Sequence, residues 1–145
     1  MVATIELAGL DKFQIAMDDL SDDIRDQVDM AVVATGLDLE RDIKQRIMRG
    51  PATGRVYQKY NPRRTHRASA PGEAPATDTG RLANSVTFKQ DAQASVSVFS
   101  LLKYAPWLEF GTFRMGPRPA WVPAVEAMRP KYGKRLEAAL SGVLR

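Results

Sequence analysis

An apolar stripe at helical spacing constrains the fold of this chain more than any other feature. Apolar or small side chains recur every three or four positions between Ile24 and Ile47, at Val28, Ala31 or Val32, Thr35, Leu39 and Ile43. This spacing predicts one long amphipathic helix. Ser21 is its predicted N-cap, Gly36 weakens its middle without breaking it, and Gly50-Pro51 ends it.

Changes in the apolar period predict the remaining elements. A short strand is expected over Val2 to Leu7 and a first amphipathic helix over Leu10 to Leu20. From Val86 to Val98, apolar and polar side chains alternate on both sides of a polar turn at 90–93, which is typical of a β-hairpin. Apolar side chains at helical spacing over 125–143 predict a last helix. The predicted fold is α+β, with a long N-terminal helix packed on a small antiparallel β-sheet and a closing C-terminal helix.

A basic, proline-rich loop is predicted at about residues 51–80, within a single domain that spans residues 1–145. Eight lysines and arginines and no acid lie between Ile43 and Gly72, with Tyr57 and Tyr60 among them. Such a segment can bind nucleic acid through phosphate contacts and stacking. The other interpretation is a solvated loop that becomes ordered against neighbouring subunits, and we favour it because no recognised nucleic-acid module surrounds the segment. The residues that could face DNA or another subunit are Arg55, Lys59, Arg63, Arg64 and Arg67.

The formal net charge of +4 conceals a division along the chain. Residues 1–42 carry eleven acids against three bases, a net charge of −8, whereas residues 43–145 carry eighteen bases against six acids, a net charge of +12. One interpretation is that the solvated faces simply differ in sign. The other is that the acidic part of one subunit faces the basic part of its neighbour, which would suit a head-to-tail ring.

The composition argues against a metal protein or a membrane protein. The chain has no cysteine and only one histidine, His66, which argues against disulfides, thiolate catalysis and most zinc sites. No apolar run approaches the roughly 20 residues that span a bilayer, and no secretory signal is visible at the N-terminus. We therefore expect no cofactor, no metal and no membrane contact, and we expect the chain to be made and folded in a cytoplasm.

The triplet Asp78-Thr79-Gly80 also occurs in the active site of aspartic proteases, in which two carboxylates share a proton. The next residue, Arg81, would keep both carboxylates ionised and remove the acid that this reaction needs. We therefore do not expect an enzyme. In the structural interpretation, Asp78 or Thr79 caps the following segment and Gly80 supplies a positive φ angle. Arg81 then becomes a candidate partner for a carboxylate, either Asp78 or Glu109.

A second segment combines one carboxylate with large apolar groups. Glu109 either points into water or is buried, and burial would require a hydrogen bond or an ion pair with an arginine such as Arg81 or Arg118. Four large aromatic residues lie within 15 positions: Trp107, Phe110, Phe113 and Trp121. We interpret them mainly as core, although tryptophan is also enriched in interface hot spots. Pro106 argues against a central strand in this segment.

Fifteen residues from these segments form an ordered series: Asp78, Thr79, Gly80, Arg81, Leu82, Ser85, Tyr104, Ala105, Glu109, Phe110, Gly111, Thr112, Pro119, Pro123 and Ala124. The series resembles a family of bacteriophage neck proteins. These are the tail-completion or head–tail joining proteins of long-tailed phages, the gene-product-ten-like family of lambdoid phages (minor tail protein Z type). The resemblance extends from about Ile5 to the C-terminus. It departs from the family in a longer insert between Gly50 and Pro75, and in the run 113–117 where glycines are usual.

The resemblance implies a structural virion protein of the phage neck or tail, made in the host bacterial cytoplasm. Its first implied partner is itself, in a homo-oligomeric ring for which a hexamer is the expected size. The ring would complete the tail end and join it to the head connector or stopper proteins. It would also contact the tail terminator or tail tube proteins, and genome DNA would pass through its channel. The alternative is a small basic DNA-binding protein, which the basic loop and a pI near 9.6 support.

Overall fold

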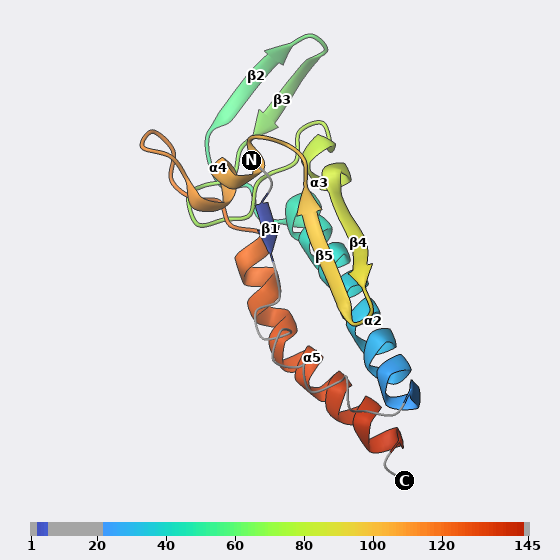
Figure 1. Cartoon of the computed structure of the whole chain (residues 1–145). Coiled ribbons are helices and arrows are strands. Elements are labelled where there is room, and N and C mark those ends of the chain that lie inside the picture. Colours follow the sequence, from blue (N-terminus) through green and yellow to red (C-terminus); the bar gives the residue numbers. More distant parts are fainter. Residues whose placement is uncertain (1–2, 6–21, 144–145) are drawn as a thin grey trace.

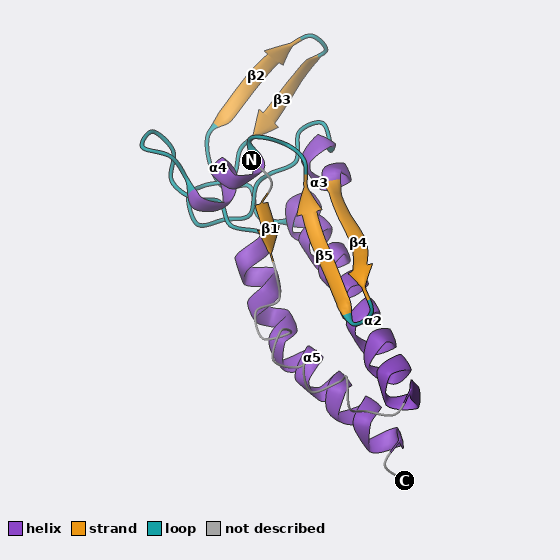
Figure 2. Ribbon diagram, viewed as in Figure 1, coloured by secondary structure: helices purple, strands orange, loops and turns teal. Residues whose placement is uncertain are grey.

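The computed structural model describes residues 3–5 and 22–143. Within these ranges the fold is α+β, as predicted (Figure 1, Figure 2). The elements in chain order are β1 (Ala3–Ile5), α2 (Asp22–Arg49), β2 (Val56–Tyr60), β3 (Arg63–Arg67), α3 (Arg81–Ser85), β4 (Val86–Ala92), β5 (Ser95–Ser100), α4 (Ala105–Phe110) and α5 (Trp121–Val143). The predicted helix over Leu10 to Leu20, the N-cap Ser21 and both ends of the predicted strand over Val2 to Leu7 lie outside the described residues.

Helix α2 is continuous, and Gly36 does not interrupt it. Its buried residues confirm the predicted stripe: Val28, Ala31, Val32, Thr35, Gly36, Leu39, Ile43 and Ile47. A Cβ atom at position 36 would lie 2.6 Å from the Phe88 ring and 2.9 Å from Val96, both of which belong to the sheet. Glycine therefore lets the sheet approach the middle of the helix more closely than any other residue would.

A three-stranded antiparallel sheet with the strand order β1-β5-β4 packs against α2. Strands β4 and β5 form the predicted hairpin, but β4 is longer than expected and the turn moves to residues 93–94. Asp29 of α2 holds this turn, because its carboxylate accepts hydrogen bonds from the Ala94 N–H at 2.7 Å and from the Gln90 side chain at 2.9 Å. Helix α2 therefore contacts the β4–β5 hairpin through hydrogen bonds at the turn as well as through the apolar core.

Helix α5 closes the fold and lies along α2 (Figure 1). Its predicted inner face is confirmed, with Met128 buried and Val125, Tyr132, Leu136 and Leu140 packed against the core. Arg135 connects the two helices, since it donates hydrogen bonds to the Thr35 hydroxyl at 3.0 Å and to the Asp38 carboxylate at 2.7 Å. The hydrogen bond from Arg135 stabilises the charged carboxylate and lowers the pKa of Asp38 from its ordinary value.

The structure corrects the prediction for residues 51–80, which do not form one irregular loop. Strands β2 and β3 pair as an antiparallel hairpin that projects from one end of the molecule (Figure 1). Five residue pairs set its register, from Val56 opposite Arg67 to Tyr60 opposite Arg63. Prolines and charges dominate the sequence around these strands, and their apolar residues do not alternate to build a buried apolar face, so the periodicity that signals a strand is missing.

Candidate functional site

The two motif segments meet at a groove between the β2–β3 hairpin and α4. Its volume is about 410 Å³. It is lined by Tyr57, His66, Ala68, Ser69, Pro75, Ala76, Thr77, Asp78, Thr79, Gly80, Arg81, Leu82, Tyr104, Leu108, Met115 and Arg118. Six of the fifteen predicted motif residues are among them: Asp78, Thr79, Gly80, Arg81, Leu82 and Tyr104. Folding therefore brings together segments that the sequence separates.

Asp78 anchors the hairpin to this groove. Its carboxylate accepts a hydrogen bond from Lys59 and pairs with Arg64 at 2.7 Å. His66 Nδ1 lies 3.8 Å from the same carboxylate. The hydrogen bond from Lys59 holds the pKa of Asp78 below its ordinary value, and the charge of Arg64 acts in the same direction. The predicted pair between Asp78 and Arg81 is wrong, because the hairpin supplies the bases.

Gly80 is the N-cap of helix α3, and its φ angle of 75° confirms the predicted positive φ. The Gly80 N–H donates to the Thr77 hydroxyl at 3.1 Å, and the Arg81 N–H donates to the Thr79 hydroxyl at 3.4 Å. The prediction that Asp78 or Thr79 caps this helix is wrong, because Gly80 itself is the N-cap and no side chain caps it by a hydrogen bond, while Asp78 pairs with the hairpin.

Glu109 is buried, with 7% of its surface exposed, and it caps the start of α5. One carboxylate oxygen accepts hydrogen bonds from the N–H groups of Ala120 and Trp121 at 2.8 and 3.1 Å. The other accepts one from the Val122 N–H at 2.7 Å. These N–H groups have no partner within the helix, and they carry the positive end of its dipole. The prediction that a buried Glu109 must be hydrogen-bonded is confirmed, but the predicted arginine partner is wrong.

The other predicted motif residues serve the fold around this cap. Ser85 donates a hydrogen bond to the Leu82 carbonyl, and its hydroxyl lies 2.7 Å from that of Ser100 on β5. Leu82, Ala105 and Ala124 are buried core residues. Pro123 lies in the first turn of α5, where a missing N–H leaves no helical bond unmade, and Pro119 precedes that turn.

Gly111 ends α4 with a φ angle of 77°. A Cβ atom there would meet the Met115 carbonyl oxygen at 2.8 Å, so the glycine is needed for a tight return of the chain. Thr112 closes the loop, since its N–H donates to the Met115 carbonyl at 2.8 Å. Phe113 is therefore presented at the tip of a short, braced loop.

Three of the four predicted core aromatics point into solvent instead. Their exposed fractions are 56% for Trp107, 70% for Phe110 and 92% for Phe113. On α4 the inner positions are taken by Ala105, Pro106 and Glu109, so the opposite face must carry Trp107 and Phe110. The prediction of core is right only for Trp121, which is 3% exposed. We refer to Trp107, Phe110 and Phe113 as the aromatic patch.

The structure divides the predicted basic contact residues into two groups. Lys59 and Arg64 point inward to Asp78. Arg55, Arg63 and Arg67 are exposed, and the Arg55 guanidinium lies 5.6 Å from the centre of the Tyr57 ring. The second group is the more exposed one and makes no ion pair with Asp78, whereas the charges of Lys59 and Arg64 are already balanced by that carboxylate.

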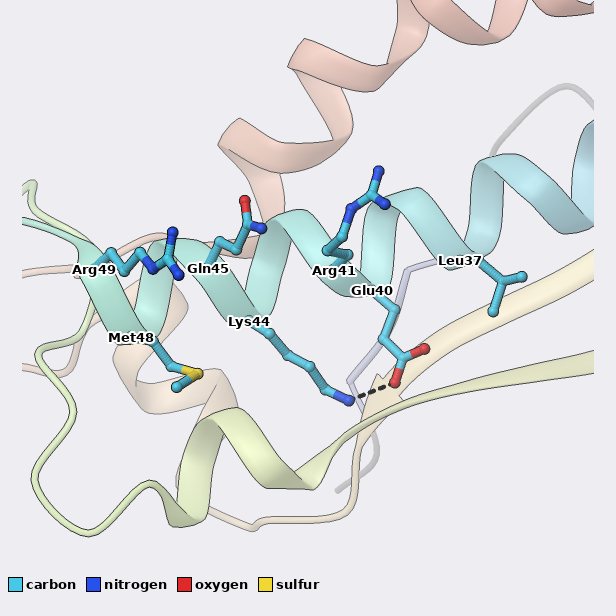
Figure 3. A pocket seen from close by; sticks show the side chains of 7 residues that line it. All are labelled: Leu37, Glu40, Arg41, Lys44, Gln45, Met48 and Arg49. Carbon is cyan, nitrogen blue, oxygen red and sulfur yellow. Dashed lines mark hydrogen bonds and ion pairs between the residues drawn. The ribbon is translucent and has the colours of Figure 1, made fainter.

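A second, shallower groove of about 250 Å³ lies along the exposed side of α2 (Figure 3). All of its lining residues come from this one helix: Leu37, Glu40, Arg41, Lys44, Gln45, Met48 and Arg49. Two of its three bases are paired locally, Arg41 with Asp38 and Lys44 with Glu40. The groove is therefore an exposed helix face rather than an enclosed binding site.

Among residues 3–5 and 22–143, no group of three or more histidine, cysteine, aspartate or glutamate side chains is placed to hold a metal ion. None of the described helices is both long enough and apolar enough to cross a membrane. The groups that the site does offer are a braced hairpin, exposed arginines and the aromatic patch.

Comparison with known proteins identifies one family. The family model described as "Bacteriophage HK97-gp10, putative tail-component" matches residues 11–111. The match includes the β2–β3 hairpin, the Asp78 segment and α4 with Glu109, and it ends before α5, the helix that Glu109 caps. No curated protein and no solved structure matches the chain.

Proposed function

Because the chain belongs to the bacteriophage HK97-gp10-like family of tail components, we propose that it forms a homo-oligomeric ring at the neck end of the phage tail. A tail component is a virion protein and associates with other virion proteins. In our proposal the ring is a hexamer that completes the tail and joins it to the head connector. Stopper proteins contact one side of the ring and tail terminator or tail tube proteins the other, while genome DNA passes through the channel. We propose a structural role and no enzymatic one.

The observation that carries this proposal is the aromatic patch. Trp107, Phe110 and Phe113 expose more than half of their surface in the single subunit. Aromatic side chains, phenylalanine included, are enriched in the buried core of interfaces, and tryptophan is enriched among the residues that dominate binding energy. Two of the three lie on a helix that Glu109 fixes to the core, and the third lies on a braced loop. A rigid apolar surface of this kind supports a partner that covers it, which in our proposal is another virion subunit.

The test is the mass of the purified chain at several concentrations, measured by light scattering and native mass spectrometry. We expect a discrete ring for the wild type. Replacing Trp107, Phe110 and Phe113 together with serine should raise the concentration for half-assembly at least about thirtyfold, since hot-spot residues contribute about 2 kcal/mol or more each. The free energy of unfolding of the monomer should change little, because the three side chains are exposed.

A matched control is Met48→Ser on α2, which is 59% exposed and lies outside the aromatic patch. This variant should assemble like the wild type. Assembly of the triple serine variant at wild-type concentrations would contradict the proposal.

The exposed arginines of the hairpin favour a second candidate, the small DNA-binding protein. Arg55, Arg63 and Arg67 present positive charge that Asp78 does not neutralise. A chain of this class would remain a monomer or dimer, and its DNA affinity would fall steeply as salt is raised. The mass of the purified protein and the salt dependence of its DNA affinity together separate the two candidates.

A further inference from the structure

The β2–β3 hairpin has two faces with different chemistry. In an antiparallel pair, opposite residues point to the same side. The pairs Lys59–Arg64 and Tyr57–His66 therefore share one face, which turns toward Asp78. The pairs Val56–Arg67, Gln58–Thr65 and Tyr60–Arg63 share the other face, and all six residues are exposed. We call this second group the outer face of the hairpin.

The outer face is positively charged and partly apolar. Arg63 and Arg67 form no ion pair within the ranges 3–5 and 22–143. Tyr60 is 80% exposed and Val56 is 44% exposed. Glu73 is nearby in the sequence but is already used, because it accepts hydrogen bonds from the Thr53 and Ala70 N–H groups. The complementary surface would carry carboxylates around an apolar centre.

The same chain presents such a surface at the start of α2. Asp22, Asp23 and Asp26 are exposed there, and Met30, one turn further along, is 55% exposed. Asp22 also pairs with Arg25 at 3.3 Å, so Asp23 and Asp26 carry most of the negative charge that this end offers to a partner. Asp29 belongs to the same stretch but holds the β4–β5 turn. We call Asp22, Asp23 and Asp26 the acidic end of α2.

The outer face of the hairpin and the acidic end of α2 lie at opposite ends of the molecule (Figure 1). They cannot meet within one subunit, but they can meet between two. A contact between different surfaces on successive copies is heterologous, and it builds a ring when the rotation between copies closes. Helix α4, which carries Trp107 and Phe110 of the aromatic patch, lies at the same end of the molecule as the hairpin (Figure 1), so a single neighbour could touch both.

We propose that the outer face of the hairpin docks on the acidic end of α2 in the next copy of this chain, and that this contact sets the relative orientation of neighbouring subunits in the ring. The inference rests on the proposed ring. A second copy is favoured over DNA as the occupant because both complementary surfaces are present on this chain. A five-residue strand is only about 17 Å long, so the contact buries far less than the roughly 800 Å² per partner of a stable interface. It therefore directs assembly, while the aromatic patch supplies most of the buried apolar area.

Charge reversal tests the pairing. One variant carries Arg63→Glu and Arg67→Glu, and the other carries Asp22→Lys, Asp23→Lys and Asp26→Lys. At low salt each variant alone should need about tenfold more protein for half-assembly, because like charges then face one another across several rim contacts. An equimolar mixture of the two should assemble near the wild-type concentration, since every junction again joins opposite charges. Circular dichroism checks that the monomers keep their helix content.

A matched control reverses two exposed bases elsewhere, Arg129→Glu and Lys134→Glu on α5. This variant changes the net charge as much as the hairpin variant does, and it should assemble like the wild type. If it loses assembly while the hairpin variant does not, the partner of the acidic end is α5 and the inference is overturned.

The remaining outcomes separate the inference from the proposed function. A wild-type ring that withstands both reversals would overturn the inference and leave the ring in place. A wild-type chain that stays monomeric at every concentration would overturn both. If the hairpin reversal abolishes salt-dependent binding to duplex DNA and leaves the mass unchanged, then DNA occupies the outer face and the inference is wrong.

Discussion

Glu109 should be the carboxylate whose removal destabilises this fold most clearly. It is buried and accepts three hydrogen bonds from the first N–H groups of α5, at 2.7, 2.8 and 3.1 Å. In Glu109→Ala all three donors lose their acceptor. The Val122 N–H can be rehydrated, because that residue is 43% exposed, whereas Ala120 and Trp121 are 0% and 3% exposed.

Two donors therefore remain dry and unpaired in Glu109→Ala. Each buried, unsatisfied N–H costs about 1–3 kcal/mol, so we expect the free energy of unfolding to fall by about 2–6 kcal/mol. Glu109→Gln keeps the shape and one acceptor oxygen, but its NH₂ group faces a donor and the favourable charge at the helix start is lost. We expect a loss of about 1–3 kcal/mol for this variant.

The assay is urea denaturation of the monomer followed by circular dichroism, at protein concentrations below assembly. Glu126→Gln provides the control, since it makes the same chemical change at an exposed position one turn further along α5. It should stay within about 0.5 kcal/mol of the wild type. If Glu109→Gln unfolds at the same urea concentration as Glu126→Gln, the cap does not stabilise α5 and our reasoning is refuted.

Three further predictions concern the backbone and the hairpin. Gly36→Ala should lower the free energy of unfolding by about 1–3 kcal/mol through overpacking against the sheet, whereas Gly133→Ala, where nothing lies within 4 Å, should be neutral or stabilising; equal effects would contradict the close approach. Gly80→Val should lower the melting temperature more than Ala76→Val, because of these two positions only 80 has a positive φ angle, and comparable melting temperatures would count against it. Asp78 has a lowered pKa, so its contribution to hairpin stability is present above the ordinary carboxyl pKa and is lost as the pH falls through the lowered value. Hydrogen exchange of residues 56–67 should accordingly be slow at neutral pH and faster in Asp78→Asn, and unchanged protection in that variant would rule out the anchor.

The sequence by itself determined the elements whose signal repeats within a short window. The stripe from Ile24 to Ile47 predicts α2 with its buried face, and the alternation around residues 86–98 predicts the β4–β5 hairpin. Both follow from local periodicity, since 3.6- and 2-residue repeats place side chains on one face whatever the rest of the chain does. The ordered motif series likewise indicated a phage tail family, and the match over residues 11–111 confirms it.

Only the tertiary structure decided which distant groups became partners. Glu109 is close in the sequence to several arginines, yet it caps a helix, because α4 is turned so that this side chain meets the start of α5. Asp78 meets Lys59 and Arg64 because a hairpin with little apolar content folds back over it. The same turn of α4 that buries Glu109 sends Trp107 and Phe110 outward. Whether a side chain is buried, paired or free depends on where other segments arrive, and no local pattern of residues carries that information.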